Sequence, residues 1–224
     1  MDRVSGTPQP GTQPQPSVEE RRTGDRHMAV LQVARLILHD RQALCLVRNM
    51  SAGGVMIHSE ARIDSNEEVA IELKFAGLVG ARVAWRRGIA AGLQFHRPID
   101  VARALGRDRD SDNQPRGPRI EVFADATITV GGEASATSVI DVSQGGAKIV
   151  WPGPLVREKV ELAIEGLVPR AARMCWADGE HAGIAFNMAL PFEMLAGWAL
   201  ARQPRVSLYH LVAAPTGDGS EARD

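Results

Sequence analysis

Three arginines, Arg21, Arg22 and Arg26, stand close together near the start of the chain. A guanidinium group is a planar fork of N–H donors that meets two acceptors at once, so it suits a phosphate or the Hoogsteen edge of guanine. The Arg-x-x-x-Arg spacing carries little information alone, because it occurs twice more in this sequence. The arginines therefore indicate an anion site only if a second motif supports them.

A second group of residues lies in the run NMSAGG, which contains Asn49, Ser51, Gly53 and Gly54. An asparagine can bond a base edge, a serine offers a donor and an acceptor, and glycines allow a ligand to approach the backbone closely. The alternative is a tight turn, because Asn, Ser and Gly are also common turn residues. Taken once, the run favours the turn.

The run is repeated. NMSAGGVMI, which begins at Asn49, recurs as DVSQGGAKI from Asp141, an offset of 92 residues. Two aromatic pairs follow at an offset of 91: Trp85 with Trp176, and Phe95 with Phe186. A register that holds over this length predicts two homologous units, and makes an accidental turn the poorer explanation.

Each unit shows six short strand-like runs without an intervening helix. In the first unit they are 29–38, 44–48, 55–58, 68–75, 79–85 and 89–95. In the second they are 120–130, 136–142, 147–150, 159–164, 171–177 and 182–187. This order predicts an antiparallel meander that closes into a barrel and so removes its edges.

Composition and turn residues divide the chain into five parts. They are a disordered leader at 1–20, a first unit at 21–105, a linker at 106–118, a second unit at 119–202 and a tail at 203–224. Pro191–Arg202 is predicted to be a short helix with proline in its first turn, and Ile99–Leu105 its shorter counterpart.

Together, Arg22-x-x-x-Arg26 and Asn49-x-Ser51-x-x-Gly54 resemble the PilZ domain, a bacterial receptor domain for cyclic di-GMP. The later run ARVAWRRGIAAGLQF is similar to the last two strands of that family. The resemblance covers about residues 20–105 and, less completely, 116–202. It implies an all-β chain of two consecutive six-stranded antiparallel PilZ-like barrels, each followed by a short helix.

The resemblance also implies a ligand site for cyclic di-GMP in the first unit. Its residues are Arg21, Arg22, Arg26, Asn49, Ser51, Gly53 and Gly54. The two motif arginines would contact phosphate and guanine, the asparagine and the serine the base edges, and the glycines would admit the ligand against the backbone. Arg21 is similar to the arginine of members that bind an intercalated dimer of the nucleotide, and a solvated side chain is its alternative reading.

The second unit departs from the motif. Its corresponding residues, a weaker second site, are Arg116, Arg119, Asp141, Ser143 and Gly146. Arg-x-x-Arg replaces Arg-x-x-x-Arg, and two prolines stiffen the segment. Arg119 precedes Asp141 by 22 residues, close to the 23 between the second arginine and the asparagine of the first unit. We expect a degenerate domain that is structural or partner-binding.

Other features exclude several function classes. The 26 basic and 27 acidic residues give a net charge of −1, which leaves no basic field for DNA or a membrane surface. The two cysteines and six histidines show no metal-ligand or catalytic spacing, so neither an enzyme nor a cofactor is predicted. The four repeated tryptophans and phenylalanines are expected in the cores. Without a signal peptide or membrane span, a cytoplasmic protein is expected.

The sequence thus favours a receptor that changes conformation on binding cyclic di-GMP and is read by another protein, with a homodimer also compatible. A first alternative is a ligand-independent PilZ-type adaptor whose helix at 191–202 docks on a partner. A second is a small-barrel binder of single-stranded nucleic acid, which the near-neutral charge and single tyrosine disfavour. The downstream pathway stays open.

Overall fold

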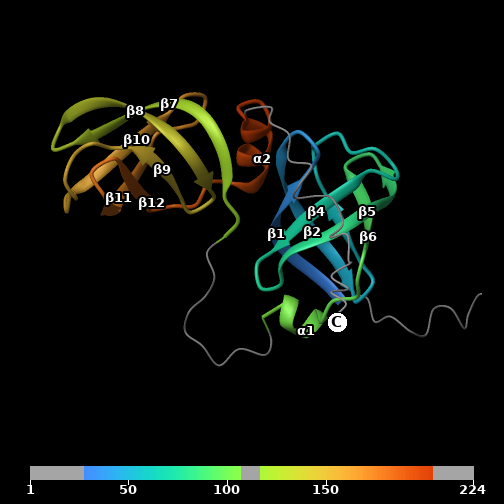
Figure 1. Cartoon of the computed structure of the whole chain (residues 1–224). Helices are drawn as coiled ribbons and strands as arrows, with labels where there is room; N and C mark the ends of the chain where they lie inside the picture. Colours follow the sequence, from blue (N-terminus) through green and yellow to red (C-terminus); the bar gives the residue numbers. More distant parts are fainter. Residues whose placement is uncertain (1–27, 107–116, 204–224) are drawn as a thin grey trace, which may run out of the picture.

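The computed structural model describes residues 28–106 and 117–203, which form two closed β-barrels (Figure 1). The first contains β1 (Met28–Ile37), β2 (Gln42–Ser51), β3 (Gly54–His58), β4 (Glu68–Leu73), β5 (Gly77–Arg87) and β6 (Ala90–Phe95), followed by α1 (Val101–Ala104). The second contains β7 (Ile120–Val130), β8 (Glu133–Ser143), β9 (Gly146–Val150), β10 (Lys159–Ile164), β11 (Arg170–Ala177) and β12 (His181–Phe186), followed by α2 (Phe192–Leu200). The predicted pair of six-stranded antiparallel barrels, each with a short helix after it, is confirmed.

The order of strands around each barrel differs from the predicted meander. The first barrel runs β1-β2-β3-β6-β5-β4, and the second repeats this order from β7 to β12. The chain between β3 and β4, at 59–67, is too long for a tight hairpin, and the segment after β9 contains Pro152 and Pro154. Each segment crosses the barrel end, so β4 closes against β1 and β10 against β7.

Strands β2 and β8 are among those that extend further than the sequence predicted. β2 reaches Ser51 and therefore includes both polar residues of the first motif. β8 begins at Glu133 instead of Ala136, because the β7–β8 ladder continues to the two-residue turn at Gly131 and Gly132. Both glycines have positive φ, 57° and 91°, which residues with a side chain rarely adopt in such a turn.

Each barrel has its own apolar core. Strand β7 shows the pattern that builds it, since buried residues alternate with exposed ones from Ile120 to Ile128. Phe95 and Phe186 are buried in the first and second cores respectively, as predicted. The tryptophans of the same repeat lie elsewhere, as described below.

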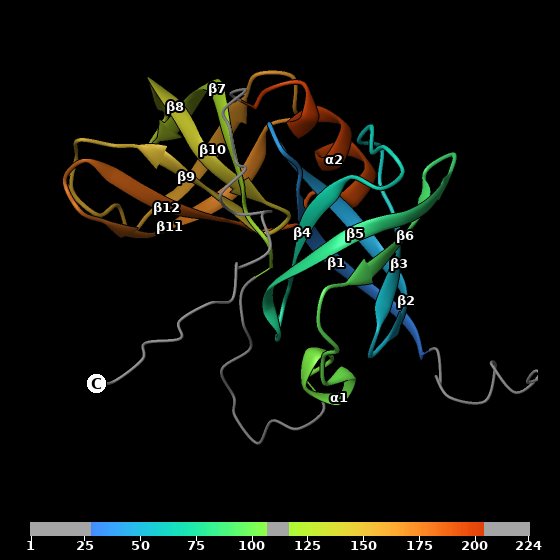
Figure 2. The same ribbon diagram turned by 45° about the vertical axis from the view of Figure 1, so that its right-hand side comes forward.

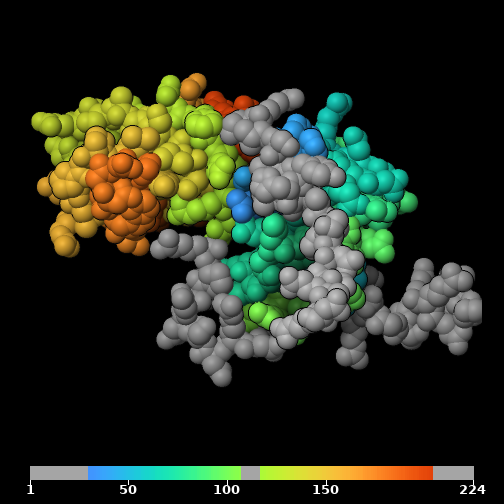
Figure 3. All heavy atoms as spheres, viewed as in Figure 1, coloured from blue at the N-terminus to red at the C-terminus, as the bar shows by residue number. Residues whose placement is uncertain are grey.

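Helix α2 lies between the two barrels (Figures 1 and 2). Leu44 of β2 is buried in the core cluster of the second barrel, and Leu200 of α2 packs against the core of the first. Just beyond the helix, the side-chain oxygen of Gln203 accepts a hydrogen bond from the backbone N–H of Gln42 at 2.7 Å. In space-filling view the barrels are two lobes that meet along one boundary (Figure 3). They share side chains across that boundary.

Candidate functional site

Three β-bulges shape the same region of each barrel. In the first barrel the pairing register shifts between Ala29 and Gln32, between Val47 and Asn49, and between Val83 and Trp85. In the second it shifts between Glu121 and Ala124, between Val139 and Asp141, and between Met174 and Trp176. A bulge bends its strand and redirects the neighbouring side chain. The motif residue of the second strand and the tryptophan of the fifth therefore stand at bulges in both barrels.

The serine of the motif closes the turn that follows it. The Ser51 hydroxyl donates to the carbonyl oxygen of Gly54 at 3.3 Å, and Ser143 makes the same bond to Gly146 at 3.2 Å. Both serines are buried. Their protons serve the turn in this structure, so only the hydroxyl lone pairs are available to a ligand.

The last glycine of each motif is required by a neighbouring strand. A Cβ atom at Gly54 would lie 2.5 Å from the backbone oxygen of Leu93, and one at Gly146 would lie 2.1 Å from that of Ile184. At Gly53, by contrast, a Cβ atom would meet nothing within 4 Å. The structure thus gives Gly54 a packing reason in addition to the ligand contact that the motif predicts.

The two tryptophans were expected in the cores, and that expectation is wrong. Trp85 is 39% exposed, and Trp176 is partly exposed. Each indole lies across the glycine of the next strand, since a Cβ atom at Gly92 or Gly183 would fall within 2.2 Å of the indole Nε1. The bulge beside each tryptophan turns the side chain outward, which a strict two-residue alternation did not reveal.

In the first barrel these residues line an open groove of about 520 Å³. Its walls include Asn49, Ser51, Gly53, Gly54, Trp85 and Gln94. Within the described part of the chain the side chain of Asn49 makes no hydrogen bond, so its amide is free for a ligand. The predicted residues Arg21, Arg22 and Arg26 lie outside the described residues. Strand pairing sets Ala29 opposite Asn49, three positions after Arg26 in sequence.

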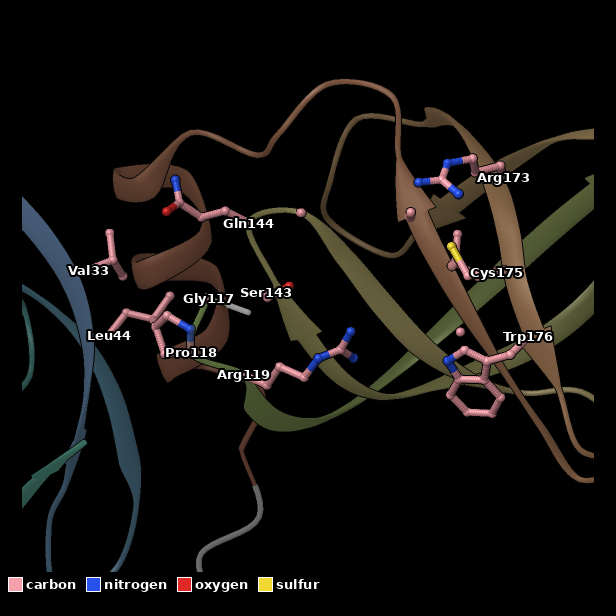
Figure 4. Close-up of a pocket in the computed structure, with 14 residues that line it drawn as sticks. Val33, Leu44, Gly117, Pro118, Arg119, Ser143, Gln144, Arg173, Cys175 and Trp176 are labelled. Carbon is pink, nitrogen blue, oxygen red and sulfur yellow. The ribbon is translucent and has the colours of Figure 1, made fainter. Parts of the chain in front are cut away.

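In the second barrel some of the corresponding residues, namely Ser143, Gly145 and Trp176, line a cavity of about 320 Å³ at the boundary between the barrels (Figure 4). Val33 and Leu44 of the first barrel form one side, and Arg173, Cys175 and Trp176 of β11 stand opposite them. The sequence analysis did not single out Arg173 or Cys175. The two-residue alternation along β11 could have indicated that both side chains point to the outer face, the side of the cavity.

Arg119 enters this cavity and is already paired. Its Nη1 lies 2.5 Å from Oδ1 of Asp141, and the two side chains are 34% and 20% exposed. In the strand pairing, Asp141 stands opposite Lys148 of β9. Arg116 lies outside the described residues. The acid of the second motif is therefore committed within the protein, unlike Asn49.

The PilZ domain family model matches residues 20–107 and 113–195. The chain belongs to the PilZ domain family. No curated protein matches its sequence. The PilZ barrels resemble solved structures at low identity: PlzA of Borreliella burgdorferi in complex with cyclic di-GMP, with 13% identity, TM-score 0.32, and coverage of 80% of this chain and 94% of that one. Bacillus subtilis MotI/DgrA, an inhibitor of motility, is 12% identical with a TM-score of 0.30, and the match covers 78% of this chain and 97% of that one. Escherichia coli YcgR in complex with cyclic di-GMP is 10% identical with a TM-score of 0.29, and the match covers 75% of this chain and 80% of that one.

By strand register, Arg119 of the second unit does not correspond to Arg26 of the first unit. Met28 pairs with Met50, and Ile120 pairs with Val142, so Ile120 corresponds to Met28. Arg119 therefore occupies the position of residue 27, one step beyond that of Arg26. Arg119 comes directly before β7, which pairs with the strand that bears Asp141, and the two side chains form their ion pair there.

Across 28–106 and 117–203, no group of three or more His, Cys, Asp or Glu side chains is placed to hold a metal ion. Among the helices of the same residues, none is long and apolar enough to cross a membrane. The arrangement is that of a binding groove.

Proposed function

We propose that this PilZ protein is a receptor for cyclic di-GMP and that its principal site is the groove of the first barrel. The observation that carries the proposal is the amide of Asn49, which no described residue pairs with, in an open groove beside the strand that Arg22-x-x-x-Arg26 precedes. Cyclic di-GMP combines two phosphates with guanine edges, and the arginines and the amide match these groups.

Different residues of the groove would contact different parts of the nucleotide. Asn49 offers both a donor and an acceptor to a guanine edge, whereas Trp85 offers a partly exposed indole on which a base can stack. Arg22 and Arg26 supply the positive charge that the groove itself lacks. Each charged contact contributes about 1.5–3 kcal/mol in such a complex.

We further propose that the ligand changes the surface that other proteins meet. Phosphate contacts would hold Arg22 and Arg26 over the groove and fix the segment that carries them. A partner that binds this altered surface would then sense the nucleotide. Without such a change, the chain would be a ligand-independent adaptor, which is the competing function.

The cavity at the second barrel is a second candidate site for the same ligand, because it brings Arg119 and Arg173 together beside Trp176. To use Arg119, the nucleotide would have to compete with Asp141 for the guanidinium. Losing a partly buried ion pair offsets much of the gain from a new phosphate contact. We therefore assign the second barrel the weaker affinity.

Calorimetric titration of the full chain with cyclic di-GMP, with GTP and an oligonucleotide as ligand controls, tests the proposal. Arg22→Ala and Arg26→Ala should each weaken binding by about ten- to more than a hundredfold, since each removes a charge-assisted contact. Arg103→Ala, which changes an exposed arginine of α1, is the matched control and should bind normally. Unchanged affinity in both motif variants would refute the site, and no binding by the unaltered chain would favour the adaptor.

A further inference from the structure

One strand edge differs between the two barrels. In the first, β2 pairs with β3 only from Leu46 onward, so 42–45 have β1 on one side alone. In the second, β8 pairs with β9 only from Val139 onward, so 133–138 have β7 on one side alone. The 92-residue offset superposes these two edges.

The edge in the first barrel is covered by the protein itself. The N–H of Gln42 donates to Gln203, and the carbonyl of Leu44 accepts from the Ser59 hydroxyl at 3.3 Å. Helix α2 packs beside β2, and the Leu44 side chain is buried in the second core. One backbone group of Gln42, one of Leu44 and the apolar side chain of Leu44 are thus satisfied on this edge.

The edge in the second barrel is covered only at its inner end, where the Thr137 hydroxyl donates to the carbonyl oxygen of Val150. For Ala134 and Ala136 the described residues provide no such partner. Val130 and Glu133 flank the two-residue turn and so face one another through hydrogen bonds, which directs the N–H and C=O of Ala134 and Ala136 to the open side. These two alanines correspond to Gln42 and Leu44. The hairpin extends away from the first barrel, so α2 does not reach it (Figure 1).

The open edge carries little of the usual protection against strand addition, since Glu133 beside the turn is its only charged residue. Residues 133–138 read EASATS, with no lysine and no proline. Ala134, Ser135, Ala136 and Ser138 are exposed, and their small side chains leave the backbone accessible. Such an edge is a template for an added strand.

A broad trough runs beside this edge on the outer face of β8, β7 and β10. It has a volume of about 860 Å³ and a floor of small residues that includes Thr127, Ala136 and Ala163. Its charged lining residues are Asp125 and Glu165, both carboxylates, with no lysine or arginine among the lining residues. A segment that lies here would meet negative charge beside the free edge.

We propose that the β8 edge, 134–138, and the adjoining trough bind an extended segment of a partner protein that carries lysine or arginine. The segment adds a strand to β8 through main-chain hydrogen bonds, and its basic side chains reach Asp125 and Glu165. A second copy of this chain fits less well, because two facing edges would bring two acidic troughs together. The chain's own residues 206–214 contain no lysine or arginine.

This inference goes beyond nucleotide binding and concerns a different face of the second barrel. The probe for its test is a synthetic nine-residue peptide, Lys-Thr-Val-Thr-Lys-Thr-Val-Thr-Lys, added to the full ¹⁵N-labelled chain and followed by NMR. Amide shifts should concentrate at 125–127, 134–138 and 163–165. A peptide with glutamate in place of lysine, and one with proline at alternate positions, should both fail to bind.

Charge reversal in the protein provides the matched comparison. Asp125→Lys combined with Glu165→Lys should weaken the lysine peptide roughly tenfold or more, since it turns two attractions into repulsions. Glu180→Lys combined with Glu193→Lys changes the net charge equally at exposed positions outside the trough and should leave binding within about twofold. Equal loss in both double variants would overturn the proposal.

Hydrogen exchange of the free chain distinguishes the other possible occupants. In the proposed arrangement the amides of Ala134 and Ala136 exchange rapidly in the free chain and slow on peptide addition. Protection in a dilute monomer would mean that the chain covers its own edge. Protection that grows with concentration, together with a dimer in sedimentation, would assign the edge to a second copy. Either result would overturn the partner segment.

Discussion

The two barrels share nearly every feature that builds the fold and differ in the few side chains that could bind a ligand. Both repeat the strand order, the three bulges, the serine-closed turn and the tryptophan laid over a glycine. At the motif position, however, Asn49 is free in the described structure and Asp141 is paired with Arg119. The motif's turn residues therefore maintain both barrels, whereas the proposed recognition of the nucleotide rests on the polar side chain that stays unpaired among the described residues.

The barrels also differ in their surroundings. The groove of the first barrel is lined by that barrel alone, whereas the cavity of the second is closed on one side by Val33 and Leu44 of the first. A ligand in the first groove meets solvent and whatever segment folds over it. A ligand in the second cavity would contact both barrels at once, so its affinity would depend on how the two barrels are placed relative to one another.

The largest effect is expected where one barrel depends on the other. Leu44→Ala removes a side chain that belongs to a strand of the first barrel and is buried in the second core. Deleting a buried leucine costs about 2–5 kcal/mol, and here the loss should lower the stability of the second barrel and of the shared boundary. Chemical denaturation followed by hydrogen exchange within each barrel measures the distribution.

Leu36→Ala is the control, since Leu36 is equally buried but lies only in the first core. It should destabilise the first barrel and leave the second transition nearly unchanged. If the two variants gave the same pattern, Leu44 would not couple the barrels.

The next effect compares the two motif glycines. Gly54→Ala and Gly146→Ala both force a Cβ atom against a backbone oxygen, which cannot move as a flexible side chain can. Overpacking of this kind costs about 1–3 kcal/mol, and the closer approach at Gly146 should make it the more destabilising change. Thermal unfolding measures both.

The neighbouring glycines give matched controls, because a Cβ atom at Gly53 or Gly145 would meet nothing within 4 Å. Gly53→Ala should retain stability, and any loss of nucleotide affinity in it would then report a ligand contact. Stability equal in all four variants would contradict the packing role of the last glycine.

Much of this architecture could be predicted from the sequence because it depends on local patterns. The alternation of apolar residues identified all twelve strands, and the repeated NMSAGG and DVSQGG runs identified two homologous barrels. The strand order could not be read in this way, since the closing pairs β1–β4 and β7–β10 depend on long connections that cross the barrel ends. Bulges likewise insert a residue without a sequence signature, which is why Trp85 and Trp176 were expected in the cores.

The candidate site was predictable only as far as its residue types. The motif named Asn49 and Asp141 as equivalent, but the ion pair that Asp141 makes with Arg119 is a tertiary contact that the motif does not encode. Arg173 and Cys175 reach their cavity through the bulged strand β11 and the approach of the first barrel. Such placement follows from tertiary packing and not from spacing along the chain.

A smaller effect tests the inequality of the two motifs directly. Asn49→Ala removes neutral hydrogen bonds to the ligand, each contributing about 0.5–1.5 kcal/mol, so affinity for cyclic di-GMP should fall about three- to tenfold. Asp141→Ala should leave that affinity unchanged, because the principal site lies in the first barrel. Calorimetry on both variants decides; a comparable loss in Asp141→Ala would make the second barrel a working receptor.

The smallest expected change is in the alkylation rates of the two cysteines, one of which lies in each barrel. Cys45 is fully buried in β2, and burial raises the pKa of its thiol to about 12, whereas Cys175 is exposed in the cavity between the barrels. Because the thiolate is the reactive form, at pH 8 only about 10⁻⁴ of the Cys45 thiol would be ionised, and its burial excludes the reagent as well. Iodoacetamide should therefore modify Cys175 in the folded chain and Cys45 only after unfolding, as peptide mass spectrometry can establish.

Saturating cyclic di-GMP should change the rate of Cys175 modification by less than about twofold if the nucleotide occupies the first groove alone. A severalfold slowing that persists in Arg22→Ala would instead place ligand against Cys175, and the second barrel would then be the principal site.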